Sequence, residues 1–212
     1  MKDIILSLSG GLDSSSLLFE FKNRIKLAVS FKYGSNHEKR EIEAAKKVAK
    51  SAKVEHKIID LTETFKGFKS ALLSGSDAVP NSEYDKDSIS QLVVPFRNGI
   101  FLSILAGLAE SNNCEYIALA NHANDSTTYP DCRPEFIKNM FEAILSGTEG
   151  KVKLFAPYTE ITKKEIALRG IKSGLDYNLT YSCYKGSEEH CGKCPTCVER
   201  AEAIKYALEN LK

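Results

Sequence analysis

Residues 3–15 of the chain read DIILSLSGGLDSS, an apolar run followed directly by a pair of glycines and a polar stretch. The pattern predicts a strand over 3–8 and a helix over 14–22, with a tight turn between them. The free N–H groups of such a turn lie at the positive end of the helix dipole, where an anion is the natural ligand. No lysine follows the glycines as in a P-loop, and the GxGxxG spacing of dinucleotide folds is absent. The stretch therefore predicts an anion-binding loop after the first strand of an α/β fold.

Length and charge limit the classes of protein to which the chain can belong. Its 212 residues suffice for one domain, or one domain with a small appendage, that buries a core without disulfides. The 29 basic and 28 acidic side chains give a formal net charge of +1, which argues against a nucleic-acid partner. No apolar run is long enough to cross a bilayer, and the first residues begin a core strand instead of a signal peptide. We therefore expect a cytoplasmic protein without a membrane partner.

Strands and helices alternate along the first half of the chain. Apolar, β-prone runs at 25–31, 54–59 and 116–119 predict further strands, and helical spacing predicts helices over 38–52 and 99–109. This alternation predicts an α/β fold with a parallel sheet covered by helices on both faces. The loops that start at residues 9, 31 and 120, with 59 as a fourth candidate, then meet at one edge of the sheet.

The pattern changes after Pro157. Helical spacing predicts helices over 162–173 and 198–211, with a cysteine-containing loop between them. We therefore expect two regions, an α/β domain over 1–156 and a small helical region over 157–212. A polar stretch over 75–95 shows little periodicity, and its length predicts a lid or a mobile loop.

Four of the six cysteines lie close together, at Cys183, Cys191, Cys194 and Cys197. Without a secretory signal, such a cluster indicates a metal site more than disulfides. Four thiolates at this spacing can close the tetrahedron of a structural zinc site. An iron–sulfur cluster, redox-active cysteine pairs and His190 as a competing ligand are the alternatives.

Three further segments are rich in chemically active side chains: YGSNH at 33–37, VPFRN at 94–98 and DSTTYPDCRPEF at 125–136. Each segment alone has an ordinary explanation. Arg97 fits a solvated loop, His37 fits the exposed start of a helix, and Asp131 fits a helix N-cap ahead of a proline. Their joint occurrence with the first loop and the cysteines favours a functional site.

The first loop, SGGLDS at 9–14, resembles the pyrophosphate (PP) loop of ATP pyrophosphatases, which transfer AMP to an acceptor. The order of all the segments resembles the 7-cyano-7-deazaguanine synthase family of queuosine precursor synthesis. The matching parts are SGGLDS at 9–14, VPFRN at 94–98, YPDCRPEF at 129–136, SCY at 182–184 and CGKCPTC at 191–197, with Pro157, Lys163 and Glu165. The resemblance spans nearly the whole chain. It implies a Rossmann-like sandwich of the adenine nucleotide alpha hydrolase type, one structural zinc ion per chain and a homodimer.

The resemblance also implies a reaction, that of an ATP-dependent C–N ligase. Its substrates are 7-carboxy-7-deazaguanine, ammonia and two ATP with Mg²⁺. The acid is adenylated, ammonia displaces AMP to give an amide, and a second adenylation leads to the nitrile. The implied ATP-binding residues are Leu8, Ser9, Gly10, Gly11, Leu12, Asp13, Ser14 and Ser15. The implied catalytic residues are Asp13, Ser14, Arg97 and Lys163, and the implied substrate-binding residues are Tyr33, His37, Arg97, Asp131 and Arg133.

Each implied residue has a chemical role. Asp13 orders the loop or helps to hold Mg²⁺, and Lys163 and Arg97 balance the charge that builds as pyrophosphate leaves. Asp131 is expected to accept the two donors of a guanine-like edge, and Arg133 to face a carboxylate. Cys132 is an alternative nucleophile, although its neighbours predict binding by shape.

The second loop departs from the family pattern YGQRH, because Ser35 and Asn36 replace its glutamine and arginine. Ala120 also stands where the family usually has glycine. Loss of the arginine removes a phosphate or carboxylate contact, so a relative that joins the adenylated acid to an amine on a protein or peptide remains an alternative. A tRNA-modifying PP-loop enzyme is a second, disfavoured by the near-neutral charge. A zinc-ribbon interaction module is a third, and it leaves the first loop unexplained.

Overall fold

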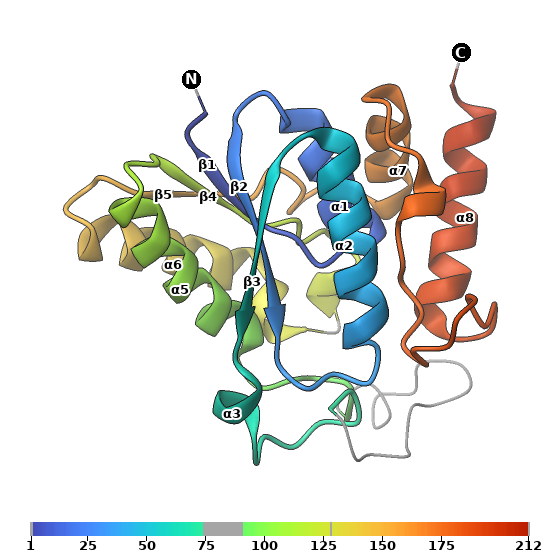
Figure 1. Cartoon of the computed structure of the whole chain (residues 1–212), viewed down its shortest axis with the longest axis horizontal. Coiled ribbons are helices and arrows are strands. Elements are labelled where there is room, and N and C mark those ends of the chain that lie inside the picture. The colour runs from blue at the N-terminus through green and yellow to red at the C-terminus, as the bar shows by residue number, and fades with distance from the viewer. Residues whose placement is uncertain (1, 74–90, 128, 212) are drawn as a thin grey trace.

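A five-stranded parallel sheet lies at the centre of the molecule, in the strand order β3-β2-β1-β4-β5 (Figure 1). The structure is a computed structural model, and it describes residues 2–73, 91–127 and 129–211. The strands are β1 (Ile4–Ser7), β2 (Ile25–Lys32), β3 (Glu55–Asp60), β4 (Tyr116–Ala118) and β5 (Lys153–Phe155). The chain passes from β1 to β2 on one side and later to β4 on the other, so the connections after β1 and β4 diverge. A divergence of this kind opens a crevice at the carboxyl edge of the sheet.

Helices cover both faces of the sheet, with α5 and α6 on one face and α1, α2, α7 and α8 on the other (Figure 1). The helices are α1 (Leu12–Phe21), α2 (Glu38–Ala52), α3 (Thr62–Phe65), α5 (Arg97–Ser111), α6 (Pro134–Gly147), α7 (Lys163–Lys172) and α8 (Pro195–Glu209). The short 3₁₀ helices are η1 (Asp125–Thr127), η2 (Pro130–Cys132) and η3 (Tyr177–Leu179).

The central strand supplies side chains to two hydrophobic cores. Ile5 belongs to the core beneath α5 and α6, whereas Ile4 and Leu6 belong to the core beneath α1 and α7. Successive side chains of a strand point to opposite faces, so a strand covered on both faces must be apolar throughout. This requirement explains the uninterrupted apolar run at the start of the chain.

The predicted α/β fold with a parallel sheet is confirmed, and the four predicted strands coincide with β1 to β4. The strand β5, the helices α3 and α6 and the short 3₁₀ helices were not predicted. The stretch over 75–95, expected to form a lid or a mobile loop, lies mostly outside the described residues.

The last quarter of the chain packs closely against the first helix. Gly170 of α7 has no side chain, and a Cβ there would lie 2.5 Å from Ser16 Oγ and 2.3 Å from the hydroxyl of Tyr177. Ile166 of α7 and Ala203 of α8 share one hydrophobic core with residues of α1. The division into regions 1–156 and 157–212 stays a prediction, and the two regions meet through this shared core.

Candidate functional site

A cavity of about 200 Å³, called here the main cavity, lies at the carboxyl edge of the sheet, where the connections that follow β1 and β4 diverge. Its walls come from the connections after β1, β2 and β4, from the starts of α5 and α7, and from the cysteine-containing loop. The segments that the sequence analysis brought to one edge therefore meet around one hollow. Asp13, Asp125 and Lys163 lie together in one part of the lining, called here the phosphate-loop end, and Tyr33, Glu41 and Arg97 line another part, called here the aromatic end.

The predicted anion-binding loop has the geometry that its glycines require. Gly10 has φ +86°, and a Cβ there would lie 2.4 Å from the carbonyl oxygen of Glu41 and 2.6 Å from the nitrogen of Ala45. Only glycine fits this backbone conformation and this close approach to α2. Helix α1 begins at Leu12 with Gly11 as its N-cap, so no side chain caps the helix. Its first N–H groups therefore remain available to an anion.

Two serine hydroxyls shape the same loop. Ser9 Oγ lies 2.9 Å from Ser14 Oγ and accepts a hydrogen bond from the backbone N–H of Gly11 at 3.2 Å. Most of the predicted ATP-binding residues line the cavity, namely Leu8, Ser9, Gly11, Leu12, Asp13 and Ser14. Gly10 and Ser15 do not line it, because Gly10 faces α2 and Ser15 is fully buried.

A buried charge cluster lies beside the loop. Asp13 Oδ2 is 3.7 Å from Lys163 Nζ and 3.6 Å from His122 Nε2, and His122 Nε2 is 3.3 Å from Asp125 Oδ2. Lys163 also forms an ion pair with Glu199 at 3.1 Å. The cluster thus combines one lysine, one histidine and three carboxylates around the start of α1.

The charges of this cluster fix its protonation. Burial alone would raise the pKa of Asp13, but the Lys163 ammonium and the His122 imidazole lower that pKa to about 2. Burial lowers the pKa of Lys163, yet Asp13 and Glu199 together raise it above its usual range. Burial likewise opposes a charge on His122, and Asp13 raises the pKa of the imidazole above its ordinary value. Asp13 is therefore an anion and Lys163 a cation at neutral pH, ready to order phosphates and to balance their charge.

Sequence reasoning predicted Asp13 and Lys163 but gave no role to His122, Asp125 or Glu199. His122 is 1% exposed, and neither ring nitrogen has a hydrogen-bond partner among the described residues. One signal was present in the sequence: His122 and Asp125 follow β4 at the same sheet edge as the anion-binding loop.

The aromatic end holds Tyr33 and His37, two of the predicted substrate-binding residues. Arg97 Nη1 donates to the Tyr33 hydroxyl at 3.3 Å, and His37 Nε2 lies 3.5 Å from Glu41 Oε2. Burial lowers the pKa of His37 to about 4, with a further contribution from the Arg97 charge. Burial raises the pKa of Glu41 to about 8, although Arg97 opposes the shift. In this structure both members of the His37–Glu41 pair are therefore mainly neutral near pH 7.

Asp131 and Arg133, the other two predicted substrate-binding residues, do not line this cavity. Asp131 Oδ2 accepts the backbone N–H of Asn98 at 2.8 Å, in the first turn of α5, and Asp131 lines a smaller neighbouring cavity. Arg133 is exposed and donates through Nε to the carbonyl oxygen of Ser126 at 3.4 Å. Their assignment to substrate stays a prediction.

Cys132 does line the main cavity and accepts a hydrogen bond from Asn98 Nδ2 at 3.2 Å. Burial raises the pKa of its thiol far above the ordinary value, and Asp125 adds to the shift. A protonated thiol is a weak nucleophile, so the environment of Cys132 favours packing over covalent chemistry.

Ser35 and Asn36, the two residues of the second loop that depart from the family pattern, do not line the cavity. Asn36 Nδ2 donates to the carbonyl oxygen of Ala71 at 3.0 Å, and Ser35 forms an isolated bridge with Leu73. Both positions therefore connect the loop to residues 71–73, and neither side chain lines the main cavity.

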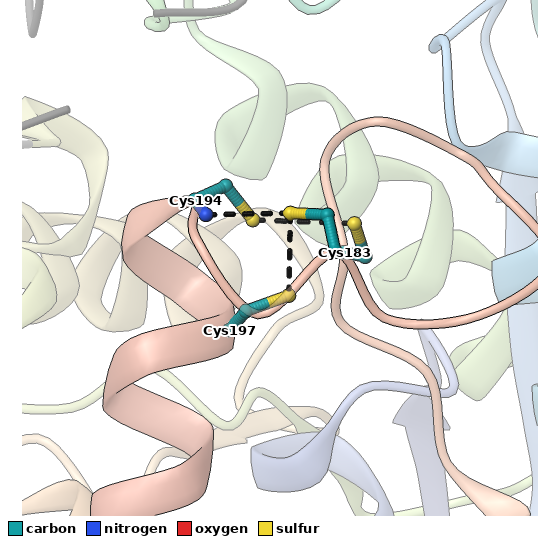
Figure 2. Close-up of side chains that lie close together, drawn as sticks. Cys183, Cys194 and Cys197 are labelled. Atoms are coloured by element: carbon teal, nitrogen blue, oxygen red, sulfur yellow. Dashed lines mark hydrogen bonds between the residues drawn. The ribbon is translucent and has the colours of Figure 1, made fainter. Parts of the chain in front are cut away.

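The four clustered cysteines come together as predicted. One sulfur from each of Cys183, Cys191, Cys194 and Cys197 lies within 4.8 Å of the others. Figure 2 shows Cys194 and Cys197 at the start of α8 facing Cys183 from the preceding loop. Cys191 Sγ accepts the backbone N–H of Cys194 at 3.3 Å, a contact that stabilises a thiolate ligand.

The donor set suits a closed, four-coordinate structural metal site. His190 is not part of the set, because its Nε2 accepts the backbone N–H of Ser182 at 3.2 Å. Zinc and an iron–sulfur cluster both use four thiolates, and the choice of zinc rests on the resemblance.

The cysteine-containing loop also forms a wall of the cavity. Ser182, Tyr184 and Thr196 line the hollow, and the Tyr184 hydroxyl lies 3.0 Å from the hydroxyl of Tyr129. The backbone N–H of Tyr181 donates to the carbonyl oxygen of Gly10 at 2.9 Å. The segment that carries the four-cysteine cluster is therefore connected directly to the anion-binding loop.

Among the described residues, none of the helices has the length and apolar character needed to span a bilayer.

The cavity combines an uncapped helix N-terminus, an Asp–Lys pair and an aromatic end with a carboxylic acid and a guanidinium. The arrangement can bind a phosphorylated nucleotide next to a flat organic ligand.

Comparison with known proteins gives consistent results. The family described as "Queuosine biosynthesis protein QueC" matches residues 3–208. A 7-cyano-7-deazaguanine synthase from Porphyromonas gingivalis is 48% identical over 203 residues, which cover 96% of this chain and 92% of the relative. The enzyme of the same name from Aquifex aeolicus is 42% identical, with 97% of each chain covered.

Among solved structures, an NMN synthetase from Francisella tularensis matches with a TM-score of 0.55 and 12% identity. The match covers 98% of this chain and 84% of the synthetase. At this identity the match supports the fold alone, and it agrees with the predicted PP-loop sandwich.

Proposed function

This chain belongs to the QueC family of queuosine biosynthesis proteins, and from that premise we propose how its cavity carries out the family's reaction. It is an ATP-dependent enzyme of queuosine precursor synthesis, of the 7-cyano-7-deazaguanine synthase type. The proposed reaction converts 7-carboxy-7-deazaguanine and ammonia to 7-cyano-7-deazaguanine. Two ATP become two AMP and two pyrophosphate, which accounts for both oxygens of the substrate carboxylate.

The observation that carries this proposal is the uncapped start of α1 at the cavity. Gly11 offers no capping side chain, Asp13 and Lys163 lie beside the free N–H groups, and Ser9 and Ser14 supply hydroxyls. The N–H groups and Lys163 are the donors that a triphosphate needs, and together they can hold its α-phosphorus toward the second substrate.

The first half of the reaction makes an acyl adenylate. A substrate carboxylate oxygen attacks the α-phosphorus of ATP, and the bond to the pyrophosphate oxygen breaks. The free N–H groups at the start of α1 and the Lys163 ammonium balance the charge on the departing pyrophosphate. Arg97, which lines the same cavity, balances the charge of the acid.

The second half of the reaction breaks both carbon–oxygen bonds of the former carboxylate. Ammonia attacks the acyl carbon, AMP leaves with one carboxylate oxygen, and an amide remains. The amide oxygen attacks the α-phosphorus of a second ATP, and loss of AMP with the amide protons gives the nitrile. Because both adenylations use the same phosphate contacts, one loop serves both steps.

The proposal also includes two metal ions, Mg²⁺ and zinc. Mg²⁺ would neutralise the phosphate oxygens, and Asp13, whose Oδ1 is buried without a hydrogen-bond partner among the described residues, is its candidate ligand. Zinc would be held by the four clustered cysteines and would keep their loop folded. The family suggests a homodimer.

The alternative that stops at an amide conjugate gains no support from the second loop, because Ser35 and Asn36 do not line the main cavity. Family membership disfavours both a tRNA-modifying enzyme and an interaction module without activity. We therefore keep the nitrile as the proposed product.

The test is incubation of the purified protein with ATP and 7-carboxy-7-deazaguanine, with and without ammonium, followed by mass spectrometry. We expect the nitrile, AMP and pyrophosphate when ammonium is present. A conjugate with another amine, or consumption of ATP to ADP, would contradict the proposal. Omission of the deazaguanine acid is the control for uncoupled hydrolysis.

A further inference from the structure

Four acidic side chains line the main cavity, and one of them, at the aromatic end, makes no carboxylate hydrogen bond to the residues that the structure describes. Asp13 and Asp125 lie with His122 and Lys163 at the phosphate-loop end. Glu38 Oε2 accepts the backbone N–H groups of Tyr33 and Gly34, at 2.5 and 2.8 Å. Glu38 therefore stabilises its own loop.

Glu41 is the remaining acid. Its side chain is 19% exposed and faces the cavity from the first turns of α2. Its contact is the ring of His37 at 3.5 Å, which is longer than a hydrogen bond. A carboxyl group that is largely buried and makes no hydrogen bond within the fold is available to a ligand.

The surroundings of Glu41 suit a flat heterocycle. Tyr33, Tyr129 and Tyr184 line the same end of the cavity, and the ring of Tyr184 lies 5.4 Å from that of His37. Arg97 also lines the cavity, and its guanidinium donates a hydrogen bond to the Tyr33 hydroxyl. The aromatic end therefore combines aromatic rings, the carboxyl group of Glu41 and the positive charge of Arg97.

We propose that Glu41 binds the N–H edge of the deazaguanine ring, with Arg97 facing the ring's carboxylate. This inference rests on the proposed function and adds a specificity residue to it. The pyrimidine edge of a guanine-like ring presents two donors, the ring N1–H and the 2-amino group. Glu41 is mainly neutral in the ligand-free protein, so it must lose its proton when the ring binds, and its two oxygens then accept both donors. Adenine presents the acceptor N1 and a C2–H at the corresponding edge, so a carboxylate discriminates against it.

Glu41 is a better candidate for this role than the predicted pair of Asp131 and Arg133. The carboxylate of Asp131 already accepts the backbone N–H of Asn98 at the start of α5. Moving Asp131 to a ligand would leave that buried N–H unpaired, at a cost comparable to the gain. Glu41 and Arg97 supply the same two charges inside the main cavity without such a loss.

The test is a comparison of two ligands on matched variants. We expect Glu41→Gln to weaken binding of 7-carboxy-7-deazaguanine by about 10- to 100-fold in calorimetry, since one acceptor becomes a donor facing a donor. Binding of ATP should change by less than about threefold. Glu43→Gln is the control, because Glu43 lies on the same helix, is 41% exposed and pairs with Arg40. It should leave both affinities unchanged.

A substrate analogue without the 2-amino group makes the assignment specific. The analogue should bind the wild type about tenfold or more weakly than the substrate, and Glu41→Gln should remove most of that difference, because the missing contact is already lost. Glu41→Asp provides the same comparison if the glutamine variant folds poorly. Thermal melting and circular dichroism check the fold of each variant.

Two results would overturn the inference. One is an equal loss of ATP and deazaguanine binding in Glu41→Gln, and the other is an unchanged preference for the 2-amino group. Either result leaves the proposed function intact if the wild type still binds the deazaguanine acid and forms AMP. Failure of the wild type to bind that acid would instead contradict the function itself.

Discussion

Asp13 illustrates how one residue combines structure and chemistry. It lies in the first turn of α1, its pKa is lowered to about 2 beside Lys163 and His122, and it lines the cavity. Its negative charge holds the lysine in position next to the free N–H groups of the loop. The same charge supplies a candidate Mg²⁺ ligand.

We expect Asp13→Asn to lower the rate of AMP formation by about 100-fold or more, because the charge that positions Lys163 and the metal is removed while the side chain keeps its size. Circular dichroism should stay unchanged. Glu202→Gln is a matched control, since Glu202 pairs with Lys164 at 3.9 Å on the surface. An Asp13→Asn variant with near-normal AMP formation would remove this residue from the machinery.

Glu41 gives a prediction about stability and pH. Burial raises its folded-state pKa to about 8 from the ordinary value of 4.5, so between these values the folded protein binds more protons than the unfolded chain. The free energy of unfolding must then fall as pH rises through this range. Burial lowers the pKa of His37 to about 4, and the opposite contribution of His37 to stability ends near the ordinary histidine pKa of 6.5. The effect of Glu41 is therefore clearest between pH 6.5 and 8.

We expect Glu41→Gln to gain stability relative to the wild type as pH rises from 6.5 to 8, because glutamine has no proton to lose. Urea unfolding of both ligand-free proteins across this range measures the difference. A constant difference over the whole range would show that Glu41 has an ordinary pKa in the folded protein.

At the scale of single residues, sequence reasoning found several residues of the cavity and missed others in or next to it. Asp13, Tyr33, His37, Arg97 and Lys163 were predicted and line it. His122 and Glu41 were missed for a physical reason. Their importance comes from burial beside other charges, and burial of a charged side chain cannot be read from local sequence.

At the scale of elements, two pieces cooperate: the start of α1 and the cysteine-containing loop. The loop contacts the anion-binding turn through Tyr181 N–H and the carbonyl oxygen of Gly10, at 2.9 Å. Thr196 Oγ1 donates to the carbonyl oxygen of Ser182 at 2.7 Å, which connects α8 to the cavity wall. A metal that folds this loop thereby supports the nucleotide site.

Removal of the metal should weaken ATP binding by about tenfold or more, since the wall formed by Ser182, Tyr184 and Thr196 depends on the folded loop. By reciprocity, saturating ATP should raise the affinity for the metal, measured in equilibrium competition with a chelator, by a similar factor. Calorimetry of chelated and zinc-restored protein measures the first effect, and a colorimetric chelator assay measures the second. Equal ATP affinity with and without metal would show that the two elements are independent.

The missed elements have different explanations. Strand β5, Lys153–Phe155, and helix α3, Thr62–Phe65, are too short to give a clear periodic pattern. Helix α6 begins with Pro134 and carries apolar residues at helical spacing, so its signal was present. Asp131 was considered as an N-cap ahead of this proline, but the helix after it was not predicted.

At the scale of the whole molecule, the fold explains why distant segments form one site. The order β3-β2-β1-β4-β5 places β1 at the centre, and the connections after β1, β2 and β4 converge at its carboxyl end. Sequence alternation predicted this edge and most of the segments that meet there. It did not predict the strand order, because order depends on long-range packing between the two cores.

The central claim is that the loop at residues 9–14 presents the α-phosphorus of ATP to the carboxylate of an organic acid. The most direct test uses 7-carboxy-7-deazaguanine labelled with ¹⁸O in both carboxylate oxygens, together with ATP and ammonium, and mass analysis of the AMP. The account predicts that every AMP formed in the coupled reaction carries one ¹⁸O atom, because each adenylation transfers one substrate oxygen to phosphorus. Unlabelled AMP, with the ¹⁸O recovered in water or retained in the product, would contradict it.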